Sequence, residues 1–267
     1  MRREGMNKTC VLLVAGKGTR LRPYTITKHK CLTEVNGVPI LFNALEQLSR
    51  AGFEKTVLVV GYKAEQIQEA AGDEYGGMKL EYVRNPRYEE TNTSCSLLLG
   101  LEAARGADIV AVVEGDVFFE YAVMEELMAQ QEPNATVLEP WQEGLEGTFV
   151  ELDRNGFVSA WTHKSRQGAD YDLTDKYKTV NLHRFQWDFV AETLLPYLQS
   201  SFRNNNGTEP LEYVMDRIVR AKPNSVFGYV LRGEKWYEID DESDLRRAES
   251  IFPCMPASAR TLDLQKG

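Results

Sequence analysis

Apolar runs alternate along the first half of the chain with segments of helical spacing. Residues 9–15 and 55–61 are nearly continuous apolar runs, the pattern of strands buried on both faces. Between them, residues 39–48 carry apolar side chains at helical spacing, and Gly52 fits the position after the end of that helix. The alternation continues with a helix at 63–71, a strand at 80–83, a helix at 94–104 and a strand at 108–116. Strands that alternate with helices predict βαβ units and a mainly parallel sheet.

The pattern changes from Ala135 onward, where short strands are separated by polar turns. Strands are expected at 148–152, 157–162, 179–185 and 226–230, and helices at 187–198, 210–221 and 241–251. We interpret the strands of this half as an inserted, more antiparallel part that lies over the carboxyl ends of the parallel sheet. The sequence therefore predicts an α/β fold, a Rossmann-like three-layer sandwich with a mostly parallel central sheet. A single domain is expected over residues 1–252, with a flexible tail or linker at 253–267.

Length and charge narrow the function. The chain has 267 residues, which suits one large α/β domain. Its net charge of −9 argues against nucleic acid or an anionic membrane as a partner, although a locally basic site can still bind an anionic substrate. No stretch approaches the ~20 apolar residues of a membrane helix. The four cysteines lie far apart and form no C-x-x-C pair, which favours reduced thiols and a cytoplasmic location.

A basic, glycine-rich loop follows the first predicted strand. Ligands bind outside the carboxyl ends of strands in open α/β sheets, and glycine lets backbone N–H groups approach phosphate oxygens. Arg20 can form paired hydrogen bonds with a polyphosphate, and Lys30 adds a second positive charge. The spacing matches neither a dinucleotide fingerprint nor a P-loop, so a plain turn with solvated charges is the alternative. The residues expected here to bind a nucleotide are Val14, Ala15, Gly16, Lys17, Gly18 and Thr19.

The predicted strand at 108–116 ends on two acids, Glu114 and Asp116. Mg²⁺ prefers hard oxygen ligands, typically one or two carboxylates together with substrate phosphates and water. Asp116 is well placed for this role opposite the glycine-rich loop, and Glu114 is expected to contact the nucleotide. The alternative is that Asp116 caps the helix that follows.

Together these segments resemble a nucleotidyltransferase signature. Residues 16–25 resemble the motif G-x-G-[TS]-R-[LM]-x-P-x-T of the enzymes that make sugar nucleotides and CDP-alcohols, and residues 30–32 supply the K-x-L that follows. The usual proline before that lysine is His29, which resembles the phosphocholine cytidylyltransferase branch. The resemblance extends over about residues 9–250.

The resemblance implies Asp116 as a Mg²⁺ ligand and a second acid near the C-terminus. Residues 236–245 are similar to the family motif W-x-D-x-x-T-x-x-x-L, and Glu238 stands where the family has its metal-binding aspartate. Asp240 faces the same side of an extended strand as Glu238, so either or both remain open as ligands. Asp241 is expected to cap the last helix.

Residues 85–97 also resemble one branch of the family. They are similar to the pattern N-x-x-Y-x-x-T-N-x-x-x-S-L of CTP-dependent, choline-type enzymes. Polar side chains at a helix start suit pyrimidine edges and ribose hydroxyls, and Asn92 and Ser94 are the expected nucleotide contacts. The alternative is an ordinary capping loop with Thr93 or Ser94 at the N-cap.

The acceptor side is expected in the second half. The stretch from Lys178 to Asn181 most resembles cytidylyltransferases for 2-aminoethylphosphonate, which implies that Lys178, or Lys164, meets the attacking phosphate or phosphonate. The resemblance also suggests a helix start near the acceptor, where carboxylates and an aromatic ring can hold an ammonium. The candidates are Glu209, Glu212 and Tyr213, with Trp141 and Trp161 as further aromatic residues, and each has an ordinary core or surface role as the alternative.

The resemblance as a whole implies a Mg²⁺-dependent cytidylyltransferase. CTP and a small zwitterionic phosphonate or phosphate are the expected partners, with 2-aminoethylphosphonate favoured, and Arg20, Lys30 and Asp116 the expected catalytic residues. The alternatives are a phosphocholine cytidylyltransferase, a sugar-1-phosphate nucleotidyltransferase and a non-catalytic nucleotide-binding regulator. A homodimer or a fused partner domain stays open.

Overall fold

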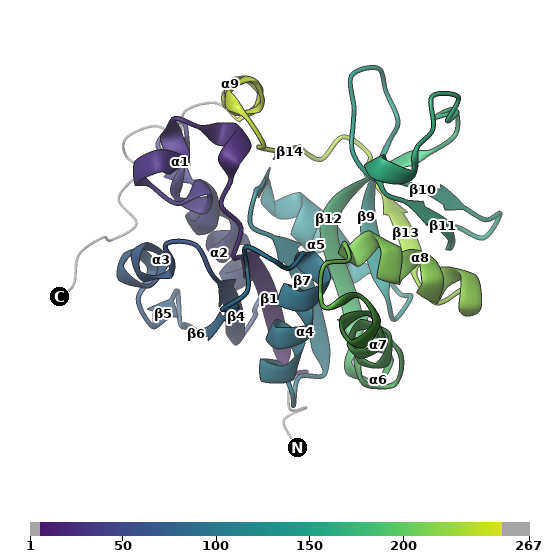
Figure 1. Cartoon of the computed structure of the whole chain (residues 1–267), viewed down its shortest axis with the longest axis horizontal. Coiled ribbons are helices and arrows are strands. Elements are labelled where there is room, and N and C mark those ends of the chain that lie inside the picture. The colour runs from purple at the N-terminus through teal and green to yellow at the C-terminus, as the bar shows by residue number, and fades with distance from the viewer. Residues whose placement is uncertain (1–5, 253–267) are drawn as a thin grey trace.

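The computed structural model describes residues 6–252. Its core is a ten-stranded sheet in the order β11-β10-β12-β7-β1-β4-β6-β5, in which β9 joins β12 and β13 (Figure 1). The strands are β1 (Lys8–Val14), β4 (Lys55–Val60), β5 (Glu74–Tyr75), β6 (Met78–Arg84), β7 (Ile109–Glu114), β9 (Ala135–Pro140), β10 (Phe149–Leu152), β11 (Val158–Thr162), β12 (Tyr177–Gln186) and β13 (Phe227–Val230).

β1 lies at the centre of the parallel part of the sheet. Leu12 pairs with Leu58 of β4 on one side and with Val113 of β7 on the other, both in parallel register. Both faces of β1 are covered, which explains the continuous apolar run that the sequence shows there. β12 runs antiparallel to β7, so the sheet changes direction where the second half of the chain begins to contribute.

Helices cover both faces of the sheet. α2 (Ile40–Arg50), α3 (Ala64–Ala71) and α5 (Tyr121–Ala129) contribute to the core on one face. α4 (Thr93–Ala103), α7 (Leu195–Asn205) and α8 (Leu211–Ala221) contribute to the core on the other. The predicted three-layer α/β sandwich, with its mostly parallel sheet and its antiparallel part, is confirmed (Figure 1). The antiparallel strands extend the same sheet beyond β7, however, and do not lie over its carboxyl ends as expected.

Two details of the second half differ from the sequence-based prediction. β9 was not predicted, although it joins β12 and β13 and four of its residues are buried. The helix expected at 187–198 extends further, because α6 (Trp187–Phe189), the π-helical turn η4 (Val190–Leu194) and α7 follow one another without a break. The predicted tail at 253–267 lies outside the described residues.

Further elements within residues 6–252 lie outside the large sheet and its covering helices. They are η1 (Thr19–Leu21), α1 (Tyr24–Thr27), η2 (Lys30–Leu32), β2 (Glu34–Val35), β3 (Val38–Pro39), β8 (Val117–Phe119), η3 (Lys164–Arg166), β14 (Trp236–Glu238) and α9 (Glu242–Ile251). β8 and β14 pair antiparallel with Glu238 opposite Val117, which brings the C-terminal acidic segment beside the end of β7. Asp241 caps α9 with a reciprocal capping box, as expected.

No helix within residues 6–252 has the length and apolar character required to cross a bilayer.

Candidate functional site

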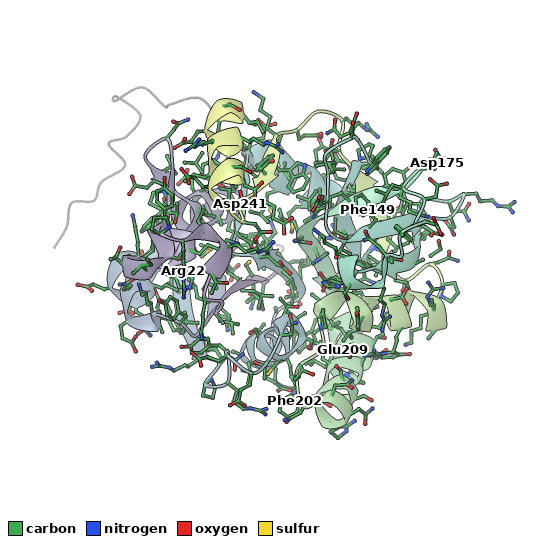
Figure 2. All side chains as sticks on the ribbon, turned by 45° about the horizontal axis from the view of Figure 1, so that its top comes forward. Arg22, Phe149, Asp175, Phe202, Glu209 and Asp241 are labelled. Atoms are coloured by element: carbon green, nitrogen blue, oxygen red, sulfur yellow. The ribbon has the colours of Figure 1, made fainter. Side chains whose placement is uncertain are left out.

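Two adjoining cavities open at the carboxyl ends of the parallel strands. The smaller measures about 310 Å³ and is lined by the glycine-rich loop, the start of α4 and the end of β7. The larger measures about 1160 Å³ and lies between the segment around β14 and the antiparallel strands. The residues common to both cavities are Arg20, Asn92, Thr93, Glu114, Asp116 and Asp240. In Figure 2, Arg22 and Asp241 lie on one side of this region, and Phe149 and Glu209 on the other.

The glycine-rich loop packs directly against Lys30. Gly18 has φ 58°, and a Cβ atom at this position would lie 2.7 Å from Cβ of Lys30. Glycine is therefore required both by the backbone conformation and by this close approach. Five of the six predicted loop residues line the smaller cavity, and Lys17 is the exception. Lys17 forms an ion pair of 2.7 Å with Glu89 instead, and its nucleotide contact stays a prediction.

Lys30 bridges two carboxylates at the junction of the cavities. Its Nζ lies 2.9 Å from Asp116 and 2.9 Å from Asp240, and Arg20 contacts Asp240 at 2.9 Å. Burial disfavours the charged form of Lys30, but attraction to the two carboxylates outweighs this and the net shift of its pKa is upward. Lys30 is thus a buried, charged group next to the glycine-rich loop.

Carboxylate oxygens of Glu114, Asp116 and Glu238 lie within 4.8 Å of one another. Burial, followed by repulsion from neighbouring carboxylates, raises the pKa of Glu114 well above its usual value. The pKa of Glu238 is also raised by burial, although Lys178 opposes the shift. Clustered carboxylates of this kind are stabilised by a divalent cation.

One oxygen of the cluster has no partner. Oδ1 of Asp116 is buried and accepts no hydrogen bond, whereas Oδ2 contacts Lys30. A free carboxylate oxygen among three converging acids fits the hard-oxygen coordination of Mg²⁺. The sequence left Glu238 and Asp240 open as partners of Asp116, but Asp240 lies outside this cluster because Lys30 and Arg20 engage it. Glu114, predicted only as a nucleotide contact, takes its place.

Gly115 permits the turn that presents these acids. A Cβ atom on Gly115 would lie 2.3 Å from Cγ1 of Val14 and 2.7 Å from the carbonyl oxygen of Leu13. The chain therefore passes against the end of β1 between Glu114 and Asp116. Ile239 donates its backbone N–H to the carbonyl of Asp116, which holds the Glu238 segment alongside.

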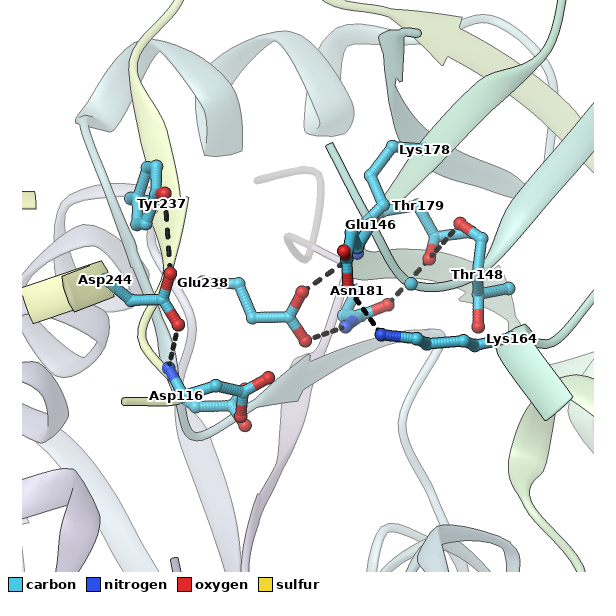
Figure 3. Close-up of polar contacts among 12 residues, drawn as sticks. Asp116, Glu146, Thr148, Lys164, Lys178, Thr179, Asn181, Tyr237, Glu238 and Asp244 are labelled. Atoms are coloured by element: carbon cyan, nitrogen blue, oxygen red, sulfur yellow. Dashed lines mark hydrogen bonds and ion pairs between the residues drawn. The ribbon is translucent and has the colours of Figure 1, made fainter. Parts of the chain in front are cut away.

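Lys178 provides a second buried cation on the opposite side of the cluster (Figure 3). Its side chain is 4% exposed, and Nζ lies 2.9 Å from Oε2 of Glu238. Asn181 donates to Oε1 of the same carboxylate at 3.3 Å. Lys178 and Asn181, which were predicted to bind the acceptor, line the larger cavity together with Glu238.

The segment before α4 contributes Asn92 to both cavities. Asn92 is the N-cap of α4, and its side chain accepts a hydrogen bond from the backbone of Thr93. Ser94 is buried and donates its hydroxyl proton to the backbone carbonyl of Glu209. Ser94 lines neither cavity, because its hydroxyl bonds α4 to the turn before α8, and its nucleotide contact stays a prediction.

Among the three ammonium candidates near α8, only Glu212 lines the larger cavity. Both oxygens of Glu209 are taken by Arg217, at 2.5 and 2.7 Å, and Ser201 donates to one of them. Tyr213 contacts Ser165 through its hydroxyl and carries the guanidinium of Arg166 on its ring. The polar groups of Glu209 and Tyr213 are engaged with Arg217, Ser201 and Ser165, and their acceptor roles stay predictions.

The aromatic candidates also lie outside the cavity lining. Trp161 is 2% exposed and belongs to the core, and Trp141 lines neither cavity. Lys164 does line the larger cavity. Two further residues that line the larger cavity, Glu139 and Trp236, were not predicted to bind the acceptor. Glu139 lies on the strand that was not predicted, and Trp236 was noted only as part of a motif.

The chain matches the MobA-like NTP transferase domain over residues 10–180. It belongs to this family. The match includes the glycine-rich loop, Lys30, Asp116 and Lys178, and it confirms the nucleotidyltransferase resemblance that the sequence motifs predict.

Individual relatives of this NTP transferase agree with the family. The chain is 35% identical over 257 residues to the CMP-5'-(3-aminopropyl)phosphonate synthase of Streptomyces rubellomurinus, covering 96% of this chain and 41% of that protein. It is 26% identical to the choline-phosphate cytidylyltransferase of Streptococcus pneumoniae, covering 91% of this chain and 97% of that protein. The chain therefore spans less than half of the first relative and nearly all of the second.

A solved structure supports the same fold. CTP:phosphocholine cytidylyltransferase from Streptococcus pneumoniae superposes with a TM-score of 0.71, at 20% identity and over 92% of this chain and 99% of that one. The relatives and this structure are all nucleotidyltransferases, in agreement with the predicted enzyme class.

Proposed function

We propose that the protein is a Mg²⁺-dependent cytidylyltransferase that transfers CMP from CTP to a small, ammonium-bearing phosphonate or phosphate. The favoured acceptor is 2-aminoethylphosphonate, and pyrophosphate is the second product. The observation that carries the proposal is the cluster of Glu114, Asp116 and Glu238, with Lys30 on its nucleotide side and Lys178 on its acceptor side. Two substrates that carry negative phosphorus groups would meet at such a cluster.

The three carboxylates would hold the metal ion. Bound Mg²⁺ supplies charge neutralisation at phosphate oxygens. The free Oδ1 of Asp116 and the raised pKa values of Glu114 and Glu238 support this role, since a cation would favour the ionised form of all three acids.

The chain's own residues would orient the reactants. An acceptor oxygen attacks the α-phosphorus of CTP, a new P–O bond forms, and the bond to the pyrophosphate oxygen breaks. The attacking phosphonate is already ionised near neutral pH, so no general base is required, and catalysis rests on positioning and on neutralising charge. Lys178 can contact the attacking phosphonate, and Lys30 and Arg20 can contact the departing pyrophosphate beside the glycine-rich loop.

Cytosine selectivity is supported by two kinds of observation. His29 and the segment 85–97 resemble choline-type enzymes, and the names of two relatives state a CMP-phosphonate product and a cytidylyltransferase activity.

A sugar-1-phosphate acceptor lacks the ammonium that an acidic acceptor cavity would select. A binding regulator would have less need of three converging carboxylates.

Phosphocholine is the second candidate acceptor. The observation that favours it is Trp236, whose ring lines the larger cavity and can contact a quaternary ammonium. The favoured primary amine instead offers three N–H donors, which form charge-assisted hydrogen bonds with carboxylates.

Pyrophosphate release tests the proposal. The protein is incubated with Mg²⁺, CTP and each of 2-aminoethylphosphonate, phosphocholine and glucose 1-phosphate. We expect the highest kcat/KM with 2-aminoethylphosphonate and no release when EDTA removes the metal. A higher kcat/KM for phosphocholine would reverse the acceptor ranking, and turnover only with the sugar phosphate would refute the proposed function.

A further inference from the structure

Glu139 and Lys178 stand directly opposite each other on neighbouring strands. The antiparallel register of β9 and β12 pairs these two residues. Directly opposed side chains point to the same face, with Cβ atoms about 5 Å apart. Both line the larger cavity. The sheet thus presents a carboxylate and an ammonium from neighbouring strands to the same cavity.

Trp236 connects the two residues. Its indole N–H donates to Oε2 of Glu139 at 3.2 Å, and the Nζ atom of Lys178 lies 5.7 Å from the centre of its ring. The indole therefore orients the carboxylate and offers an apolar surface next to both charged groups. A two-carbon or three-carbon chain between an ammonium and a phosphonate would pack against such a surface.

Glu139 is half-buried and lacks a cationic partner. No lysine, arginine or histidine among residues 6–252 forms an ion pair with it, and its carboxylate accepts hydrogen bonds from the neutral side chains of Trp236 and Gln142. Burial raises its pKa; the hydrogen bond from Trp236 opposes the shift, and the charge of Glu234 adds to it. A cation bound here would offset the free-energy cost of burying the ionised carboxylate. It would also offset the repulsion between Glu139 and Glu234.

Two other carboxylates of the larger cavity have cationic partners, since Glu146 pairs with Lys164 and Glu238 pairs with Lys178. Glu212 accepts a hydrogen bond from the neutral Thr148, and Glu114 belongs to the acidic cluster. Glu209 is held by Arg217 outside the cavity. Glu139 differs from Glu212 and Glu114 because it stands directly opposite Lys178 on the neighbouring strand, where it can accept an ammonium.

We infer that Glu139, oriented by Trp236, binds the ammonium of the acceptor while Lys178 binds its phosphonate. This assignment rests on the proposed function and adds the residue that would select amine-bearing acceptors. It replaces the segment around Glu209 and Tyr213, which the sequence alone suggested.

The test compares acceptors with and without the amine. Kinetics at saturating CTP are measured with 2-aminoethylphosphonate and with ethylphosphonate, for the wild type and for Glu139→Gln. Loss of a hydrogen-bonded charge contact lowers kcat/KM for 2-aminoethylphosphonate by about 10- to 100-fold, mainly through KM. The values for ethylphosphonate and the KM for CTP should stay nearly unchanged. Glu139→Asp keeps the charge and should recover part of the loss.

Glu151→Gln is the matched control. Glu151 lies on β10, lines neither cavity and pairs with Lys176, so the variant removes one negative charge without touching the acceptor. It should retain wild-type kinetics with both acceptors. Equal losses for the two acceptors in Glu139→Gln would overturn the inference, and so would no loss for either.

Calorimetric binding separates this inference from the proposed function. If the wild type released no pyrophosphate with any acceptor, the proposed function would fail. Binding of 2-aminoethylphosphonate to the wild type and to Glu139→Gln would still decide the role of Glu139. Weaker binding by the variant, with ethylphosphonate binding unchanged, supports the assignment, and equal affinities for 2-aminoethylphosphonate contradict it.

Discussion

The ammonium of Lys30 lies 2.9 Å from Oδ2 of Asp116, although 86 positions separate the two residues in the chain. The other oxygen of the same carboxylate accepts no hydrogen bond. One oxygen of Asp116 therefore pairs with the ammonium of Lys30, and the other stays open toward Glu114 and Glu238. We expect that a carboxamide cannot replace a carboxylate with these two contacts.

Asp116→Asn is expected to lower kcat by about 100-fold or more while the fold stays intact. The variant loses one of the three negative charges of the cluster, and its neutral side chain is a weaker metal ligand. Steady-state pyrophosphate release and circular dichroism check the two parts. Asp188→Asn, on the exposed surface of α6, is the control and should behave as wild type. A folded Asp116→Asn variant that kept more than about a tenth of the wild-type kcat would contradict the metal assignment.

The nucleotide preference gives a second prediction. We expect kcat/KM for CTP to exceed the values for UTP, ATP and GTP, because the small cavity is bounded by the choline-type segment at Asn92 and by His29. The measurement is a nucleotide panel at a saturating concentration of 2-aminoethylphosphonate. UTP or a purine nucleotide with a higher kcat/KM than CTP would refute it.

The parallel half of the fold was predictable because its strands are buried on both faces. Residues 9–15 and 55–61 show that burial directly as continuous apolar runs, and β1 and β4 lie there. β9 was missed because its apolar run is short and is followed by Glu139 and Pro140. The run also lies in a region of short, irregular segments. Its partners β12 and β13 lie far along the chain, so local spacing carries no sign of the pairing.

The candidate site was predictable where a motif fixes both residue type and spacing. Lys30, Asp116 and Glu238 were found in this way, and the structure brings them together. The engagement of Asp240 by Lys30 and Arg20 depends on long-range geometry that spacing does not encode. The contact between Glu209 and Arg217 also depends on long-range geometry. The sequence near a predicted helix start is the same whether the glutamate faces a ligand or an arginine.

A buried histidine gives a prediction about pH. Burial lowers the pKa of His183 to about 4, whereas an unfolded histidine titrates near 6.5. The unfolded state therefore binds more protons between these values, and the free energy of unfolding should fall as the pH falls from about 6.5 to about 4. A shift of this size corresponds to about 3 kcal/mol. His183→Gln should show a shallower pH dependence when urea unfolding is measured at several pH values.

The two proteins are compared by the slope of the free energy of unfolding against pH. The absolute free energy is not compared, because a glutamine packed between Trp161 and Phe185 destabilises the fold at every pH. Burial also lowers the pKa of His29 to about 4, so part of the slope should remain in the variant. His163→Gln, at a partly exposed position before η3, is the control and should keep the wild-type slope. Identical slopes for His183→Gln and wild type would show that His183 does not account for acid destabilisation.

The last prediction concerns the turn that connects the nucleotide side to the acceptor side. The backbone carbonyl of Glu209 accepts from Ser94, and the N–H of Leu211 donates to Thr93 at 2.9 Å. The carboxylate of Glu209 is bound by Arg217 on α8, so one residue ties α4 to α8. Glu209→Gln places an amide N–H₂ group against the guanidinium and should lower the free energy of unfolding by about 1–2 kcal/mol, after allowance for the partial exposure of Arg217.

Because Thr93 lines both cavities and Glu212 lines the larger one, a loosened turn should raise the KM for CTP and for the acceptor together, with a smaller effect on kcat. Urea unfolding and two-substrate kinetics measure the two effects. The control is Glu242→Gln, which removes a glutamate from an exposed ion pair with Arg246 and should change stability by no more than about 0.5 kcal/mol. A Glu209→Gln variant that raised only the acceptor KM, without loss of stability, would instead indicate direct contact between Glu209 and the acceptor. Such a result would restore the role that the sequence motif alone suggested for this residue.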